Sequence, residues 1–160
     1  MNTTTSNIEH VNHLMISEFS KTLEMFALNK TESQLFVTMF LNEEPMTLDE
    51  MKESLGKSKT AMSTASRTLL DYNLIERVFK KGARRDLYQA KKDLYEKFMK
   101  TYVNRWLEAL DQQITSLETI RTELNQQDNR EVNMSNKINE AIKFHRSLED
   151  VFEQISKYDQ

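Results

Sequence analysis

The fold is decided by residues 46–95, which read MTLDEMKESLGKSKTAMSTASRTLLDYNLIERVFKKGARRDLYQAKKDLY. Thr47, with Glu50 three residues later, predicts a capping box at the start of a short helix, and Gly56 predicts its end. Ser58 predicts the cap of a second helix. Two short helices joined by a tight turn that contains a glycine are typical of a helix-turn-helix.

The second of these helices is expected to run to about Tyr72 and has small or basic residues at its exposed positions. Small hydroxyl side chains and a few cations can approach the major groove of a DNA duplex, whereas a bulky or acidic face cannot. The residues near its start are closest to base edges in the usual docking. We therefore expect this helix to contact DNA through Ser58, Lys59, Thr60, Ser63, Thr64 and Arg67.

A β-hairpin is predicted directly after the helix pair. Residues 74–79 form a β-type run, residues 80–85 a turn, and residues 86–90 a returning strand. A hairpin at this place is the wing of a winged helix-turn-helix, and its cations reach the minor groove or its phosphates. We expect DNA contacts at Lys80, Lys81, Arg84 and Arg85, with Asp86 orienting a neighbouring arginine; the alternative is an exposed hairpin kept soluble by its charge.

Positive charge is concentrated in the same part of the chain. Between Lys52 and Lys92 there are eleven Lys and Arg against four Asp and Glu, although the 160-residue chain as a whole has a net charge of −3. One compact basic region within an acidic protein is typical of a nucleic-acid-binding module. A solvated basic face is the alternative that charge alone leaves open.

Composition excludes several other classes of protein. The chain has two glycines, one proline and no cysteine. These counts argue against sandwiches, propellers, glycine-rich phosphate loops and dinucleotide-binding folds, and they exclude disulfides, thiolate metal sites and cysteine nucleophiles. No apolar stretch is long enough to span a bilayer, and residues 1–7 do not read as a signal peptide. We expect a cytoplasmic protein with a mainly α fold.

Catalytic and metal chemistry find no support in the sequence. His10 and His13 lie one helical turn apart, but no third ligand is spaced to join them. Ser63 and Ser66 have no adjacent histidine that could activate either hydroxyl. We expect no enzyme activity, no cofactor and no metal site.

Long amphipathic helices are predicted on both sides of the winged segment. Apolar residues at helical spacing indicate helices over residues 8–28 and from Thr31 to about Asn42. After Asp93 the same spacing continues to Leu124, and a helix of that length spans about 50 Å. A further helix is expected over residues 138–155, after a polar stretch at Asn125–Asn129 and a loop and helix start at Asn133–Asn136.

One small winged domain cannot bury such long apolar stripes. The simplest solution is a homodimer in which the long helices pack together. Its two-fold symmetry would present two recognition helices to a palindromic operator, with half-sites about 34–36 Å apart. The expected organisation is an N-terminal helix over residues 1–30, a DNA-binding domain over 31–92 and dimerisation helices over 93–160.

The winged segment resembles the GbsR-like branch of the MarR superfamily. The matching features are TLDEM at 47–51, LGKSKTAMS at 55–63 and KKGARRDLY at 80–88. The resemblance implies a dimeric winged helix-turn-helix transcriptional regulator, commonly a repressor. Several members of the branch control uptake or synthesis of the osmoprotectant glycine betaine and respond to choline or related trimethylammonium compounds.

A quaternary ammonium ligand such as choline or glycine betaine would need aromatic faces around it. Aromatic residues recur every four positions at the start of the long helix, and others on the preceding helices could close a box against them. The candidate ligand-binding residues are Phe19, Phe26, Phe36, Tyr95, Phe98, Tyr102 and Trp106. The alternative is that this aromatic stripe is ordinary core.

Two functions of different classes therefore remain open at the level of sequence. The first is a ligand-responsive, DNA-binding repressor. The second is a helical scaffold whose basic hairpin binds an acidic protein. Their responses to salt and to unrelated DNA duplexes separate them.

Overall fold

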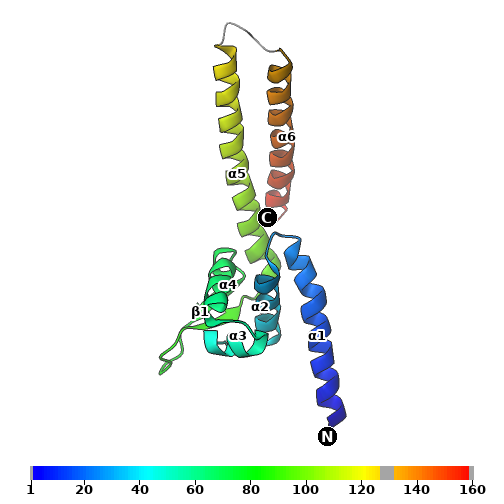
Figure 1. Cartoon of the computed structure of the whole chain (residues 1–160), viewed down its shortest axis with the longest axis vertical. Coiled ribbons are helices and arrows are strands. Elements are labelled where there is room, and N and C mark those ends of the chain that lie inside the picture. Colours follow the sequence, from blue (N-terminus) through cyan, green and yellow to red (C-terminus); the bar gives the residue numbers. More distant parts are fainter. Residues whose placement is uncertain (1, 127–131, 159–160) are drawn as a thin grey trace. The chain divides into compact units, whose positions relative to one another are not determined.

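The computed structural model describes residues 2–126 and 132–158, with side chains from residue 6 onward. The chain divides into two compact units, residues 1–98 and residues 99–160. The mainly α fold is confirmed, with a single β-hairpin among the described residues. Figure 1 shows the elements, which are α1 (Asn2–Glu24), α2 (Lys30–Leu41), α3 (Leu48–Leu55), α4 (Lys59–Asp71), β1 (Ile75–Val78), β2 (Leu87–Ala90), α5 (Leu94–Asn125) and α6 (Val132–Lys157).

The first unit contains the winged helix-turn-helix that the sequence predicts. β1 and β2 pair antiparallel, from Ile75 opposite Ala90 to Val78 opposite Leu87. The segment before α3 joins the other edge of β2, because the backbones of Met46 and Tyr88 exchange hydrogen bonds of 2.7 and 2.9 Å. This pairing fixes the start of α3 beside the hairpin.

Local capping sets the ends of the two helices of the motif. The Thr47 hydroxyl accepts the Glu50 backbone N–H at 3.2 Å, and the Glu50 carboxylate accepts the Thr47 backbone N–H at 2.6 Å. Gly56 ends α3 with a φ of +62°, in the left-handed region where glycine carries no Cβ penalty. The Ser58 hydroxyl accepts the Ala61 backbone N–H at 3.1 Å and starts α4. All three predicted caps are confirmed.

Apolar side chains from α2, α3, α4 and β1 form the core of the winged unit. Met51 of α3 and Met62 of α4 are fully buried, and the buried Ser66 hydroxyl lies 3.5 Å from the Met51 sulfur. Burial of this common face holds α3 and α4 in a fixed mutual orientation. The fully buried apolar residues of this unit include Leu35, Phe36, Val37, Met51, Met62, Leu69 and Leu74.

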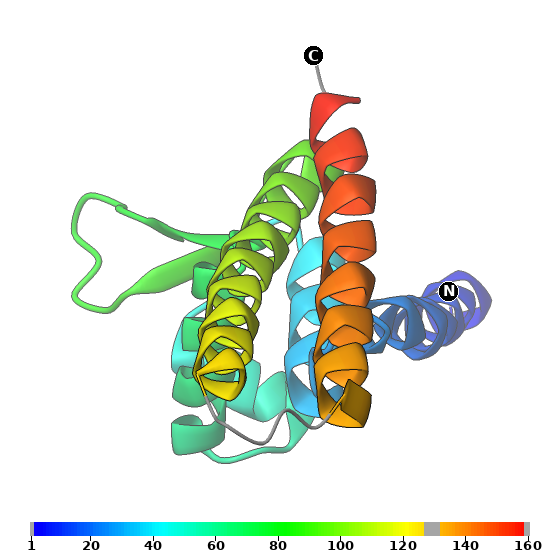
Figure 2. The ribbon, with the colours of Figure 1, turned by 90° about the horizontal axis from the view of Figure 1, so that it is seen from above.

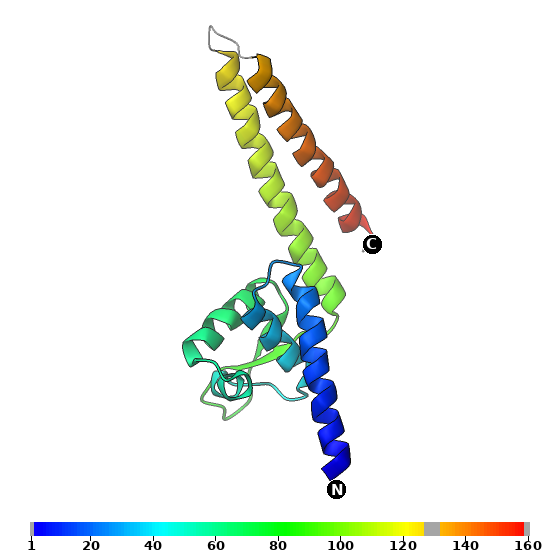
Figure 3. The same ribbon diagram turned by 45° about the vertical axis from the view of Figure 1, so that its right-hand side comes forward.

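The second unit is an antiparallel helical hairpin. Figure 3 shows α5 and α6 side by side. The apolar side chains of Leu110, Ile114, Ile138 and Ile142 are buried. Arg146 of α6 binds the Glu118 carboxylate of α5 at 3.4 Å. In the described part of the chain, none of the helices has the length and apolar character needed to cross a membrane.

Several element boundaries differ from the sequence prediction. α1 begins before residue 8 and ends at Glu24, because the chain turns at Ala27, where φ is +65°. α6 begins at Val132, so the helix start predicted at Asn133–Asn136 is confirmed to within one residue, but the loop predicted there is wrong. Asparagine and serine favour loops only weakly, and the apolar stripe that follows extends the helix through them. Residues 127–129 of the predicted polar stretch lie outside the described residues.

The strands are shorter than predicted. The sequence run 74–79 suggested a strand through Phe79, but the ladder ends at Val78 opposite Leu87. Phe79 and Asp86 therefore belong to the loop between the strands. The predicted hairpin and its position after α4 are otherwise confirmed.

Candidate nucleic-acid interface

The predicted contact residues of α4 lie on one face of the helix. Lys59, Ser63 and Arg67 follow one another at four-residue spacing, and such residues stack along a helix. Lys59 and Arg67 are exposed, whereas Ser63 is half-buried. Met62 and Leu69 are fully buried on the opposite face. Core packing therefore turns the small and basic face of α4 outward, together with Thr60 and Thr64.

The wing loop, residues 79–86, is closed by a tight turn. The Ala83 backbone N–H donates to the Lys80 carbonyl at 3.0 Å, and Gly82 at the third turn position has a φ of +88°. Positive φ at that position is required in a type II turn and favours glycine. Figure 2 shows the loop extending away from α3 and α4. The four predicted contact residues of the loop are all exposed: Lys80, Lys81, Arg84 and Arg85.

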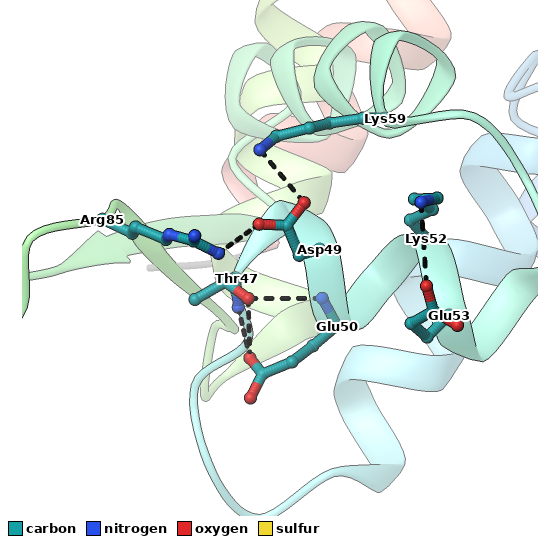
Figure 4. A network of polar contacts seen from close by, with 7 residues as sticks. All are labelled: Thr47, Asp49, Glu50, Lys52, Glu53, Lys59 and Arg85. Atoms are coloured by element: carbon teal, nitrogen blue, oxygen red, sulfur yellow. Dashed lines mark hydrogen bonds and ion pairs between the residues drawn. The ribbon is translucent and has the colours of Figure 1, made fainter.

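One carboxylate connects the two predicted DNA-contacting elements. Asp49, in the first turn of α3, accepts the Lys59 ammonium at 3.0 Å through Oδ1 and pairs with Arg85 through Oδ2. Figure 4 shows the two cations approaching Asp49 from α4 and from the wing. The start of the recognition helix and the end of the wing loop are thus held at the same point of α3.

The electrostatics of Asp49 follow from these partners. The hydrogen bond from Lys59 lowers the pKa of the Asp49 carboxyl below its ordinary value of 3.8, against the opposing effect of desolvation. The nearby charges of Lys59 and Arg85 lower the pKa further. Asp49 is therefore ionised at neutral pH, and the two ion pairs persist there.

The sequence does not predict a role for Asp49. It predicts that Asp86 orients a neighbouring wing arginine, whereas Arg85 pairs with Asp49, a residue 36 positions earlier in the chain. A contact over that separation leaves no periodic signal in the sequence. The only local indication is an acid in the first turn of α3, which is common at helix starts in general.

Most of the predicted ligand-binding aromatics contact another aromatic ring. In the first unit, Phe19 contacts Phe36 at 5.9 Å between ring centroids, and Phe26 contacts Phe98 at 5.1 Å, both edge to face. In the second unit, Trp106 lies 6.3 Å from Tyr102 and also stacks on Phe152 at 4.9 Å, a partner that the sequence did not suggest. Tyr95 is exposed. A common ligand box stays a prediction.

His10 and His13, which are not expected to bind a metal, are both exposed on α1. Within residues 2–126 and 132–158, no three His, Asp or Glu side chains gather closely enough to hold a metal ion. The exposed face of α4 and the wing loop together form a basic surface.

Comparison of the sequence with known proteins shows the family of this chain. The chain is 30% identical over 138 residues to the HTH-type transcriptional repressor OpcR of Bacillus subtilis (strain 168), which covers 84% of this chain and 75% of that repressor. It is also 30% identical over 142 residues to the HTH-type transcriptional repressor GbsR of the same organism, covering 89% and 78%. The chain belongs to the GbsR-like branch of the MarR superfamily.

Membership of this branch makes the chain a DNA-binding transcriptional regulator and not an enzyme. A crystal structure of a transcriptional regulator shares the fold of this GbsR-like protein, with a TM-score of 0.68, 17% identity, and coverage of 93% of this chain and 98% of that one. No family model matches the sequence. The individual DNA contacts predicted on α4 and the wing stay predictions.

Proposed function

We propose that this GbsR-like regulator represses genes for uptake or synthesis of an osmoprotectant and that a quaternary ammonium compound controls its DNA binding. The observation that carries the proposal is the joint cationic surface of α4 and the wing, connected through Asp49 to α3. Such a surface presents a helix to the major groove and a loop to the neighbouring minor groove. That two relatives of the same branch are repressors supports the proposal that this chain represses transcription.

The proposed DNA contacts divide into two kinds. Residues on α4 read base edges, with Arg67 as the longest donor and Thr60, Ser63 and Thr64 as short neighbours. The cations of the wing bind phosphates or the minor groove, where the potential is most negative. Phosphate contacts position the protein, and base contacts specify the operator.

The proposed active species is a homodimer. Large apolar side chains are exposed on both helices of the second unit, including Ile120 at 49%, Phe144 at 61% and Val151 at 52%. Exposed apolar area of this kind indicates a surface that another protein surface covers. A second copy of the chain would cover it symmetrically and present two α4 helices to a palindromic operator. In this arrangement residues 31–92 bind DNA, while residues 1–30 and 93–160 serve dimerisation and ligand binding.

The proposed ligand site uses aromatic faces of the long helix. Trp106 is 39% exposed although it stacks on Phe152, so part of its indole is accessible to a ligand. A trimethylammonium group has no proton to donate and binds such faces by cation–π attraction. Binding would change the separation of the two α4 helices, and the ligand's preference for one state sets the size of the response.

The test is calorimetric titration of the purified protein with choline and with glycine betaine, followed by operator binding in the presence of each. The proposal expects saturable binding of at least one compound, with a dissociation constant of about micromolar to millimolar. It also expects that this compound changes operator affinity. If neither compound binds, or if binding leaves operator affinity unchanged, the ligand part of the proposal fails.

A further inference from the structure

Phe79 is the large apolar residue that the fold leaves most exposed among the described residues. It directly follows β1, and 95% of its surface is accessible to water, compared with 1% for Ile75 at the other end of the strand. The β-ladder has ended at Val78, so no cross-strand residue covers the ring. A phenyl ring in this position gains contacts only from a partner molecule.

The surroundings of Phe79 are strongly cationic. The wing loop, residues 79–86, contains four Lys and Arg and one acid, and all of its residues are exposed. The turn at Lys80–Ala83 and the ion pair of Arg85 with Asp49 restrain the loop on both sides. The ring is therefore part of a shaped surface that combines one large apolar group with several positive charges.

The minor groove of DNA matches that combination. Its walls consist of deoxyribose carbons between phosphates, and its potential is negative. Proteins that bind this groove often place an apolar side chain such as Phe against or between base steps, next to Arg or Lys. An acidic protein would satisfy the cations, but nothing on the described surface indicates a second protein at the wing.

We propose that Phe79 enters the minor groove with the wing and packs against deoxyribose and base edges. This inference rests on the proposed DNA-binding role of the wing and assigns to Phe79 a contribution to affinity that does not depend on salt. Lys81, two residues away, is expected to contribute to the salt-dependent part of the affinity, because a cation on a phosphate releases counterions. Substitution of the two residues should therefore affect the salt dependence of DNA affinity differently.

The experiment compares Phe79→Ala, Phe79→Leu and Lys81→Ala with the wild-type chain, using an operator selected from randomised duplexes. We expect Phe79→Ala to lower operator affinity about tenfold with an unchanged slope of log affinity against log salt. Phe79→Leu should recover part of the affinity. Lys81→Ala should reduce the slope by about 0.9. Because Phe79 is exposed, circular dichroism of Phe79→Ala should match the wild type.

A second readout locates the contact. Hydroxyl radicals cut DNA by attacking deoxyribose in the minor groove, so a wild-type footprint should include protected sugars that become cleavable with Phe79→Ala. If wild-type protein binds the operator and Phe79→Ala binds within twofold of it with the same footprint, the inference is wrong while the proposed function stands. If the wild-type protein does not prefer the operator over unrelated duplexes, the proposed function and the inference both fail.

Discussion

Arg85 of the wing is ion-paired with Asp49 of α3. The other oxygen of the same carboxylate accepts Lys59, the first residue of the recognition helix, at 3.0 Å. Two cations that are expected to face DNA are therefore already oriented by one acid in the free protein. Because the acid lies on neither of the two elements that we expect to contact DNA, we expect it to act as a positioning residue for both.

Replacement of this acid should reduce discrimination between DNA sequences. Asp49→Asn frees Lys59 and Arg85 and removes a negative charge from the DNA-facing surface. We expect affinity for unrelated duplexes to stay constant or rise, and the preference for the operator to fall about twofold to fivefold, as expected for loss of exposed ion pairs. Glu53→Gln is the matched control, since Glu53 lies on the same helix and has only a 3.7 Å contact with Lys52.

The pH dependence of this effect follows from the lowered pKa of Asp49. A carboxyl whose pKa is lowered by folding contributes its ion pairs above the unfolded value and loses them as the pH falls through the folded value. The ordinary value is 3.8, so Asp49 stays ionised throughout the range from about pH 5.5 to 8. The difference in discrimination between wild type and Asp49→Asn should therefore be constant across that range. A difference that disappears at the acidic end would contradict the assignment to Asp49.

Arg67→Ala and Arg84→Ala should both weaken operator binding. Loss of a base contact at Arg67 is expected to cost about tenfold in affinity and to relax specificity at one base pair, whereas loss of a wing contact at Arg84 weakens binding to all duplexes. Fluorescence anisotropy with operator and unrelated duplexes measures both effects. Lys143→Ala on α6 removes a cation far from α4 in sequence and serves as control. If both arginine variants bind the operator within twofold of wild type while remaining folded, the proposed docking is wrong.

Thr47→Ala should destabilise the winged unit. The substitution removes the hydroxyl that accepts the Glu50 backbone N–H, in a helix of only eight residues. Loss of such a cap lowers the free energy of unfolding by about 1 kcal/mol. Urea unfolding measures the change, and Thr47→Ser, which keeps the hydroxyl, should remain near wild type. Equal stability of Thr47→Ala and wild type would show that the capping box does not stabilise α3.

Trp106→Ala should abolish the response to choline while leaving operator affinity mostly intact. The indole stacks on Phe152 with an interplanar angle of 10° and is still partly exposed, so it can offer one face to a cation. Trp106→Phe keeps an aromatic face and should retain a weaker response, which a merely structural role for the residue would not predict. The measurement is choline-dependent release of labelled operator. An unchanged response of Trp106→Ala would exclude Trp106 from the ligand site.

The parts of the fold that could be predicted from sequence are those fixed by neighbours in the chain. Thr47, Gly56 and Ser58 act within one helical turn, so their roles as caps are readable from residue type and spacing. The amphipathic period of the long helices is equally local. Residues 46–95 predicted both the family resemblance and the mainly α fold with a winged helix-turn-helix. Both predictions are confirmed.

The parts that could not be predicted depend on tertiary contacts. A strand extends only as far as it is paired with its neighbour, whatever the β propensity of the next residue. The last pair of the ladder is Val78 with Leu87, so Phe79 lies beyond the strand and is exposed. The stacking of Trp106 on Phe152 joins two helices far apart in sequence. Asn133–Asn136 read as a loop from composition, although they continue a helix whose apolar face is buried further along.

The most direct test of the account is a salt titration of wild-type protein binding to one selected palindromic operator and to several unrelated duplexes. The cationic surface of α4 and the wing predicts that log affinity falls linearly with log salt for all duplexes. It also predicts that the operator keeps an advantage of about a thousandfold or more at moderate salt. Equal affinity for every duplex, or loss of all binding at moderate salt, would contradict a sequence-specific repressor built on this surface.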